Sequence, residues 1–257
     1  MKQSLKIYPF PELQKTAPLF SGWNDTMIFS CLQGIMGVIC APDTEHPVSA
    51  AAQLNDFCFL AGIPDARLIT FDYGRDFLIL TPQTDDWCRL IETVCGSRAV
   101  PRTRYAIQKD PDCFDRKKLK ELAGSLPEEY EIRPIDRTLY AQCLAQDWSA
   151  DLVSGFPDYE TFTRLGLGFA ALRDGVPVSG ASSYSRYRGG IEIEVDTRVD
   201  YRRRGLACAV SAALITACLD RGLYPSWDAQ NLGSVHLSQK LGYSFSHEYR
   251  VYEYTRT

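Results

Sequence analysis

A short run of arginines and a glycine, placed at the start of a predicted helix, has the residue types needed to bind a phosphate. It reads Arg202-Arg203-Arg204-Gly205-Leu206-Ala207. The first turn of a helix carries backbone N–H groups without intrahelical partners, and the helix dipole adds about half a positive charge there. Gly205 lets a phosphate approach the backbone, Ala207 leaves room over the first turn, and the arginines supply fork-shaped cations. The segment therefore predicts an anion site, and a solvated basic helix start is the alternative.

Regular patterns on both sides of this turn predict the elements that position it. Ile191 to Val195 alternates apolar residues with Glu192 and Glu194, which is typical of a strand with one apolar face. A helix from residue 206 to residue 218 follows, because apolar residues recur there at helical spacing, at Leu206, Ala209, Val210, Ala213, Leu214, Ala217 and Cys218. A further strand is expected over Leu223 to Asp228.

Upstream, the chain predicts a strand, two helices and a hairpin. The strand is Tyr130 to Pro134, and the helices lie near Arg137 to Gln146 and Tyr159 to Arg164. Asp174-Gly175 separates the apolar stretches Gly168 to Leu172 and Val176 to Tyr184, and this dipeptide favours a tight hairpin turn. Together with the strand at 191–195, this order indicates three successive antiparallel strands.

The first half of the chain has a generic α/β pattern. Helices are expected over Thr26 to Gln33, Thr84 to Cys95 and Asp115 to Ala123, and strands over Phe77 to Leu80 and Val100 to Gln108. The break at Gly124-Ser125-Leu126-Pro127 predicts two domains, an N-terminal α/β domain of unknown role at residues 1–125 and a second domain at residues 126–257.

Composition excludes several classes of protein. The 257 residues are 45% hydrophobic and 23% charged, and no apolar run approaches the length of a spanning helix, so we expect a cytoplasmic protein without a membrane partner. A net charge of -4 gives no general attraction to nucleic acid. Nine cysteines without a CxxC pair and three histidines without metal spacing predict neither disulfides nor a metal site.

The arginine turn resembles the pyrophosphate signature of the Gcn5-related N-acetyltransferase (GNAT) superfamily, Gln/Arg-x-x-Gly-x-Gly/Ala, at Arg202, Gly205 and Ala207. The segment Asn231-x-x-Ser234-x-x-Leu237-x-x-Lys240-Leu241-Gly242-Tyr243 resembles that superfamily's Asn-x-x-Ala-x-x-Leu-Tyr-x-Lys-x-Gly-Phe. The resemblance covers roughly residues 128 to 257, and more narrowly it is to the bacterial group that includes zwittermicin A resistance proteins. It implies a GNAT fold of the α/β (α+β) class, with helices on both faces of a mixed central sheet, preceded by a smaller α/β domain.

The resemblance also implies how acetyl-coenzyme A, the expected cosubstrate, is held. The pantetheine arm would pair with the strand residues Val195, Asp196 and Thr197, and an amide near Thr197 would face the thioester carbonyl. Asn231, with Ser234 in the same motif, would reach the pantetheine or the acceptor side where two strands splay apart, although Asn231 alone is also a typical N-cap. The pyrophosphate would lie on Arg202, Arg203, Arg204, Gly205, Leu206, Ala207 and Cys208.

Acetyl transfer to an amine needs a group that removes a proton, and the strand before the arginine turn offers two. Glu194 is favoured over Glu192 for its nearness, and a β-bulge would change which of them points into the groove. Both are otherwise the solvated face of an amphipathic strand. The tyrosine that serves the superfamily as general acid is replaced by Ser238, and Tyr243, Tyr249 and His236 lie near in sequence without an assignable role.

These inferences predict an N-acetyltransferase that moves an acetyl group from acetyl-coenzyme A to an amine of a small molecule by direct attack in a ternary complex. The acceptor would lie between the mixed sheet and the helices near Trp148 to Arg164. A catalytically degenerate acyl-coenzyme A-binding sensor or assembly module is the alternative, because Ser238 replaces the tyrosine. Nucleic-acid binding through Arg202 to Arg204 is disfavoured by the acidic balance. No motif identifies the acceptor or an oligomeric state.

Overall fold

The computed structural model describes residues 5–8, 12–43 and 45–256. Its contacts divide the chain into two compact units, unit 1 of residues 1–104 with 248–257 and unit 2 of residues 105–247. The boundary predicted at residue 125 thus lies inside unit 2, and the last strand belongs in part to unit 1. The sequence did not reveal this division because the chain passes between the units inside continuous strands, β6 (Ala99–Ile107) and β13 (Phe245–Thr255). No helix of the described residues is long and apolar enough to cross a membrane.

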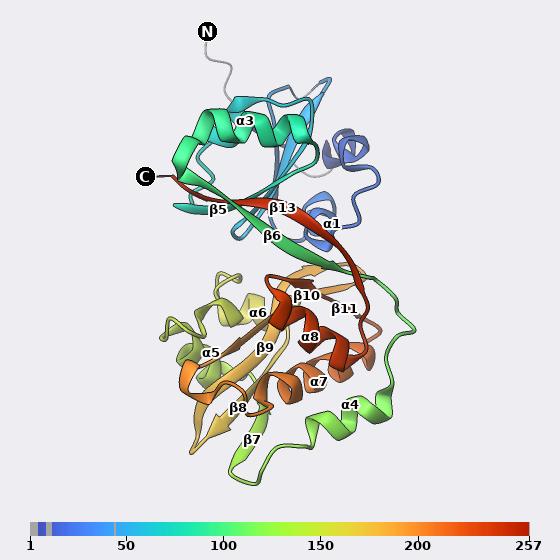
Figure 1. The fold of residues 1–257 in the computed structure, drawn as a ribbon, viewed down its shortest axis with the longest axis vertical. Coiled ribbons are helices and arrows are strands. Elements are labelled where there is room, and N and C mark those ends of the chain that lie inside the picture. The colour runs from blue at the N-terminus through green and yellow to red at the C-terminus, as the bar shows by residue number, and fades with distance from the viewer. Residues whose placement is uncertain (1–4, 9–11, 44, 257) are drawn as a thin grey trace. The chain divides into compact units, whose positions relative to one another are not determined.

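Unit 1 is a sheet with helices (Figure 1). Strands β2, β3 and β4 form an antiparallel meander, β5 lies parallel to β4, and the end of β13 pairs antiparallel with β5. Trp87 and Tyr252 are buried in its core. The elements are β1 (Lys6–Ile7), two 3-10 turns (Glu12–Lys15, Ala17–Phe20), α1 (Thr26–Leu32), β2 (Val38–Ala41), β3 (Ser49–Leu54), β4 (Phe57–Gly62), α2 (Ala66–Thr70), β5 (Phe77–Pro82), α3 (Asp85–Cys95) and a 3-10 turn (Gly96–Arg98).

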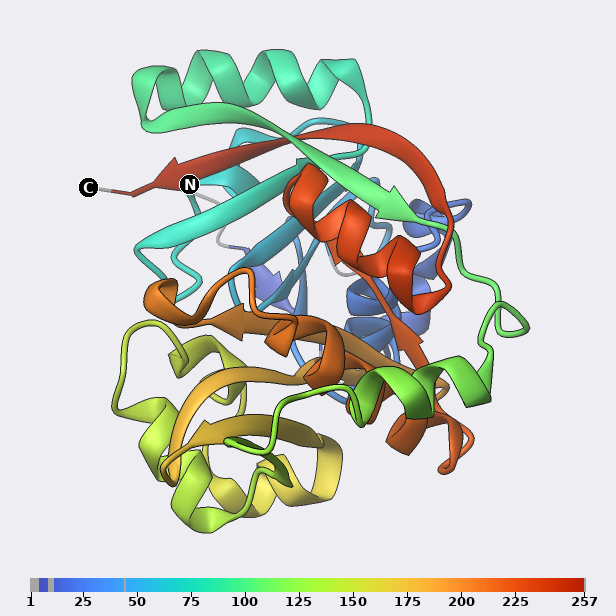
Figure 2. The ribbon, with the colours of Figure 1, turned by 60° about the horizontal axis from the view of Figure 1, so that its bottom comes forward.

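Unit 2 is a mixed sheet covered on both faces, which confirms the predicted fold class. Strands β7 to β10 are antiparallel and β11 is parallel to β10, in the order β11-β10-β9-β8-β7. Helix α7 packs on one face, with α4 beside it, and α5 and η4 pack on the other (Figure 2). The elements are α4 (Arg116–Ala123), β7 (Tyr130–Pro134), α5 (Arg137–Leu144), η4 (Ala150–Leu152), α6 (Tyr159–Leu165), β8 (Gly168–Arg173), β9 (Val176–Tyr187), β10 (Gly190–Thr197), η5 (Val199–Tyr201), α7 (Leu206–Leu219), β11 (Tyr224–Ser226), β12 (Asp228–Ala229) and α8 (Leu232–Leu241).

Local sequence explains the hairpin and the central helix. Asp174 and Gly175 both have positive φ, 53° and 77°, as a two-residue type I′ turn requires. In α7 most of the predicted stripe is buried, but Ala213 and Ala217 are only half-buried, and Ser211, Ala212 and Ile215 are buried as well. Because α4 packs against α7 from outside the sheet, this helix is covered on more sides than a single stripe predicts.

The strand predicted over Leu223 to Asp228 is two strands, which corrects that expectation. The first, β11, pairs with β10 only up to Glu192–Ser226. After Trp227 the chain turns, and β12 pairs instead with β6 at Ala106 and Tyr105. The rest of β10, residues 193–197, therefore has no strand neighbour on that side among the described residues. We call this separation of β10 from the β11–β12 segment the splay.

Candidate functional site

The start of α7 differs from the other helix starts of unit 2. A side chain caps each of α4, α5, α6 and α8, but no side chain caps α7, whose N-cap is Gly205. Gly205 has φ of 83° and ψ of −5°, and a Cβ built on it would meet no atom within 4 Å. The backbone at Gly205 thus borders open space, at the end of α7 where a helix has unpaired N–H groups and the positive end of its dipole.

Arg203, two residues before Gly205, also has a left-handed backbone, with φ of 66°. This conformation costs a non-glycine residue about 1 kcal/mol or more, so it marks a constrained loop. Left-handed residues next to right-handed ones turn successive N–H groups toward a common point, which is the geometry of backbone anion sites. The conformation of the loop therefore favours an anion at the place the sequence predicted.

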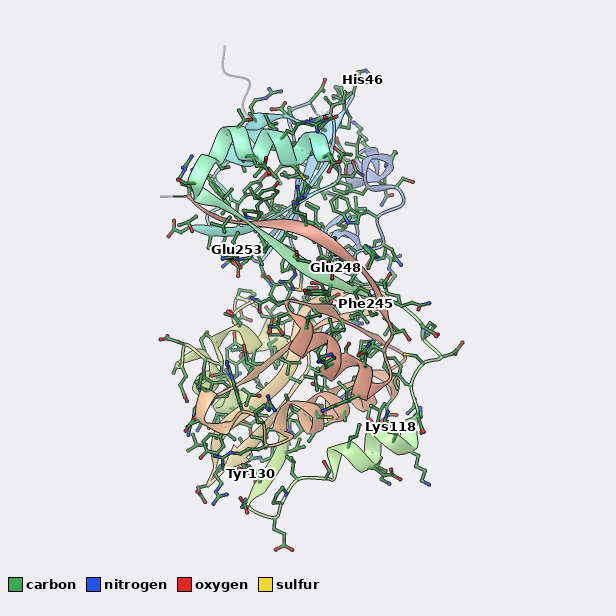
Figure 3. All side chains as sticks on the ribbon, viewed as in Figure 1. His46, Lys118, Tyr130, Phe245, Glu248 and Glu253 are labelled. Carbon is green, nitrogen blue, oxygen red and sulfur yellow. The ribbon has the colours of Figure 1, made fainter. Side chains whose placement is uncertain are left out.

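Much of the arginine cluster supports the loop itself. The guanidinium groups of Arg198 and Arg204 lie over the ring of Tyr201 as cation–π contacts. Their Cζ atoms are 4.4 Å and 4.8 Å from the ring centroid. Arg204 donates hydrogen bonds to the backbone oxygen of Asp200 at 2.9 Å and to Oη of Tyr130, labelled in Figure 3, at 3.2 Å. The bond to Tyr130 also raises the pKa of Arg204. The sequence did not indicate this role, because Tyr130 lies 74 residues away along the chain.

The other two arginines of the turn are both exposed. Arg202 donates from Nε to the backbone oxygen of Thr197 at 3.2 Å, which ties the turn to the end of β10. Arg203 has no hydrogen bond or ion pair among the described residues, and its exposed side chain is the cation of the turn that the loop does not use.

Strand β10 presents acidic side chains on the face opposite α7. Ile191 and Ile193 pack into the core with α7, so Glu192, Glu194 and Asp196 point to the face that carries η4. A bulge lies between Glu192 and Ile193, which pair with Ser185 and Ser183. The extra residue is in β9, so alternation along β10 is kept and the three carboxylates share one face.

The three carboxylates differ in their surroundings. Glu192 is 5% exposed and lies where β10 still pairs with β11. Glu194 is partly exposed, and its Oε1 accepts the N–H of Val195 at 3.1 Å, so a side chain bonds an amide predicted to pair with pantetheine.

Burial raises the pKa of Asp196 to about 6, with a contribution from Asp151 of η4 and an opposing one from Arg202. From the sequence, Asp196 was expected to act only through its backbone. The continued alternation Glu192, Glu194, Asp196 was the signal that its side chain belongs to the same face.

Beside Asp196, hydroxyl groups fix the end of β10. The Oγ1 of Thr197 lies 2.7 Å from the Oγ of Ser179, which also donates to the backbone oxygen of Asp196 at 3.1 Å. Asp196 and Thr197 pair with Gly180 and Ser179 of β9, so β10 stays held on this side while its other side opens at the splay.

The motif around Asn231 is built as a helix start. Asn231 Oδ1 accepts the N–H of Ser234 at 3.0 Å, and Ser234 Oγ accepts the indole N–H of the buried Trp227 at the same distance. Asn231 is exposed and Ser234 is partly exposed. The N-cap reading of Asn231 is therefore correct, and a contact of these residues with a coenzyme stays a prediction.

Replacing Asn231 by alanine is expected to lower the free energy of unfolding by about 1 kcal/mol, because the variant loses the acceptor for the Ser234 N–H. Urea unfolding followed by tryptophan fluorescence measures the change. Asn231→Asp is the matched control, since it keeps an acceptor oxygen and adds a negative charge at a helix N-terminus. Equal losses in both variants would contradict the capping role.

The tyrosine position of the family motif holds a buried serine, Ser238. Ser238 is fully buried, and its Oγ donates to the backbone oxygen of Val235 at 2.8 Å. Tyr243 is buried and donates to the Pro225 oxygen at 2.6 Å, and desolvation raises its pKa well above the ordinary value. Tyr249 belongs to unit 1, and His236 is exposed on α8. The inward-facing Ser238 hydroxyl is thus tied to its own helix.

The described parts of the chain contain no group of three histidine, cysteine or acidic side chains that could hold a metal ion. His46, labelled in Figure 3, is exposed before β3. All nine cysteines are free thiols, and only Cys113 and Cys208 are not buried. The cysteines of both cores thus act as small apolar side chains.

A family model described as GNAT acetyltransferase matches residues 17–252. The chain belongs to the GNAT acetyltransferase family. A GCN5-related N-acetyltransferase-like protein from Streptococcus suis 89/1591 is 48% identical, with a TM-score of 0.91 over 95% of this chain and 98% of that one. The uncharacterized N-acetyltransferase YdfB of Bacillus subtilis is 28% identical over 244 residues, 88% of this chain and 89% of the relative. A tandem GNAT protein from the clavulanic acid biosynthesis pathway shares the fold over 99% of both chains, with 11% identity and a TM-score of 0.56.

These similarities confirm the predicted superfamily and the enzyme class of acyltransferase, and the narrower resemblance to zwittermicin A resistance proteins stays a prediction. The family match covers both units of this GNAT acetyltransferase. Unit 1 repeats the order of unit 2, since β2–β3–β4, α2, β5 and α3 correspond to β8–β9–β10, α7, β11 and α8.

In unit 1 the helix that corresponds to α7 is α2, and a side chain caps its start. Strands β4 and β5 stay paired from Phe57–Ile79 to Leu60–Pro82, without a splay. The carboxylate of Asp65 accepts the N–H of Arg67 at the start of α2 at 2.9 Å, and the Arg67 side chain lowers its pKa. The Asp65 carboxylate repels an anion at the start of α2. The uncapped helix start and the splay both belong to unit 2 of this acetyltransferase.

Proposed function

We propose that the protein transfers an acetyl group from acetyl-coenzyme A to an amine of a small molecule, by direct attack in a ternary complex. The uncapped start of α7 carries this proposal. This helix start comes shortly after β10, whose last residues have no parallel strand beside them. A diphosphate could therefore bind at the helix start while the extended pantetheine arm binds along β10. A cytoplasmic setting, without nucleic-acid or membrane partners, is part of the proposal.

The proposed coenzyme contacts use backbone groups of one continuous segment. The amides from Arg203 to Cys208 would hold the pyrophosphate, with Arg202 and Arg203 as nearby cations. Val195 to Thr197 would pair with the pantetheine arm on the open side of β10, where the arm takes the place of an added strand. An amide aimed at the thioester oxygen stabilises the charge that develops during attack by about 3 kcal/mol.

The amine acceptor would lie on the carboxylate face of β10, beside η4 and the helices that follow it in sequence. A cationic amine is attracted there by Glu192, Glu194 and Asp196, and a carboxylate is the group that can take its proton. The predicted roles of Glu194 and Glu192 as proton acceptors stay predictions.

A second function is supported by Ser238. Its hydroxyl bonds Val235 inside α8, so the family's acid position holds no group able to protonate a leaving thiolate. This favours the alternative of an acyl-coenzyme A-binding sensor or assembly module without turnover. Both functions use the same coenzyme site, and only the first includes transfer of the acetyl group to an amine.

Calorimetric titration with acetyl-coenzyme A, followed by a free-thiol assay over a library of small amines, separates these functions. We expect one coenzyme per chain, because Asp65 holds the corresponding helix start in unit 1, and thiol release that depends on the amine. Binding without release from any amine would support the module. Absence of binding would overturn both.

A further inference from the structure

We infer that the side chain of Asp196 accepts the proton from the amine, ahead of Glu194 and Glu192. The inference rests on the proposed function and names a catalytic residue for it.

Position along β10 separates the three carboxylates. Glu192 lies opposite Ser226, where β10 and β11 are still paired, so the strand is closed on that side. Asp196 lies in the part of β10 opened by the splay, between Val195 and Thr197, the residues whose backbone is proposed to line the pantetheine. Its side chain points to the acceptor face, next to the place proposed for the thioester.

The hydrogen bonds of the carboxylates also favour Asp196 as the proton acceptor. Glu194 already accepts the Val195 N–H through Oε1. Asp196 has no hydrogen bond or ion pair to its carboxylate oxygens within the described residues, and only its backbone oxygen accepts a bond, from Ser179. A carboxylate without a donor has its lone pairs available for an incoming ammonium group.

The charged groups around Asp196 tune it as a base. Burial, and to a smaller extent Asp151 of η4, raise the pKa of Asp196 to about 6, while Arg202 lowers it. Glu194 is the neighbouring carboxylate on the same strand. Asp196 pairs with Gly180 of β9, which has no charged side chain. Such a group is ionised at neutral pH yet is a stronger base than an ordinary aspartate, which suits general-base catalysis.

The proton balance is complete without another reactant. The bound ammonium gives one proton to Asp196, and the nitrogen lone pair then forms the C–N bond to the thioester carbon. The C–S bond breaks and the nitrogen loses its second proton. One of the two protons ends on the coenzyme sulfur and the other passes to solvent, which returns Asp196 to its carboxylate form.

The test compares Asp196→Asn with Glu194→Gln, using the pH profile of kcat/KM with an amine that the wild-type protein acetylates. For Asp196→Asn we expect kcat at pH 7.5 to fall by about 100-fold and the acid limb of the profile to disappear. Its affinity for acetyl-coenzyme A, measured by calorimetry, stays within about twofold because the backbone contacts are kept. In Glu194→Gln the acid limb of the kcat/KM profile should remain.

The Asp151→Asn variant gives a second test, because its pH profile should shift only if Asp196 acts in catalysis and not if its role is structural. Removing a like charge lowers the pKa of Asp196, so the acid limb should move to lower pH. This readout also holds if Asp196→Asn fails to fold.

Three results would overturn the inference. They are an unchanged profile in Asp196→Asn, loss of the limb in Glu194→Gln instead, or an unmoved limb in Asp151→Asn. A wild-type protein that acetylates no amine is a failure of the proposed function, and the inference falls with it.

Discussion

Replacing Gly205 by valine is expected to weaken acetyl-coenzyme A binding by at least about 100-fold, measured by calorimetry. The variant should stay folded, since a Cβ at this position meets no atom within 4 Å. That open space is where the pyrophosphate is proposed to lie, so the valine would take the place of the ligand. Two lost charge-assisted hydrogen bonds of about 1.5 kcal/mol each account for a loss of this size.

Backbone strain is the alternative cause of any effect at Gly205, because its φ of 83° disfavours a β-branched residue. Gly222→Val is the matched control. Gly222 has φ of 67° and also meets nothing within 4 Å, but it follows α7 instead of preceding it. Both variants should lose similar stability, and only Gly205→Val should lose binding. Wild-type affinity in Gly205→Val would remove the start of α7 from the proposed site.

Replacing Gly190 by alanine is expected to lower the free energy of unfolding of unit 2 by about 3 kcal/mol or more. A Cβ at Gly190 would lie less than 3.0 Å from the backbone oxygen of Tyr224 and 2.8 Å from the Oη of Tyr187. Gly190–Tyr224 is the first pair of the parallel β10–β11 ladder. A backbone atom cannot move aside like the end of a side chain, so the two strands must separate.

Thermal and urea unfolding of Gly190→Ala measure this loss. Gly124→Ala is the control, because its Cβ would meet its nearest atom at 3.5 Å, an ordinary contact, and its stability should change by no more than about 0.5 kcal/mol. An unchanged midpoint in Gly190→Ala would contradict the tight approach of β10 and β11 from which the splay begins.

Most helices and strands, and the uncapped start of α7 where an anion site is proposed, were predictable because their signals are local. Asp174-Gly175 specifies its turn through backbone conformations that few other residues adopt. The apolar spacing from Leu206 to Cys218 specifies α7, and a glycine before that helix specifies a start without a side-chain cap. These features depend on residues within one or two turns of each other, so the sequence contains them in full.

Only the tertiary structure decided what depends on distant segments. The break at Trp227 and the return of β13 to unit 1 follow from pairings with β6 and β5, far away in the chain. The use of Arg204 to hold the loop depends on Tyr130. The basicity of Asp196 arises from burial and from Asp151, because a pKa reflects the charges and solvent around a group rather than its neighbours in sequence. The sequence alone thus determined the segment for which a coenzyme site is proposed, and the packed structure decided how the side chains around that segment are paired and buried.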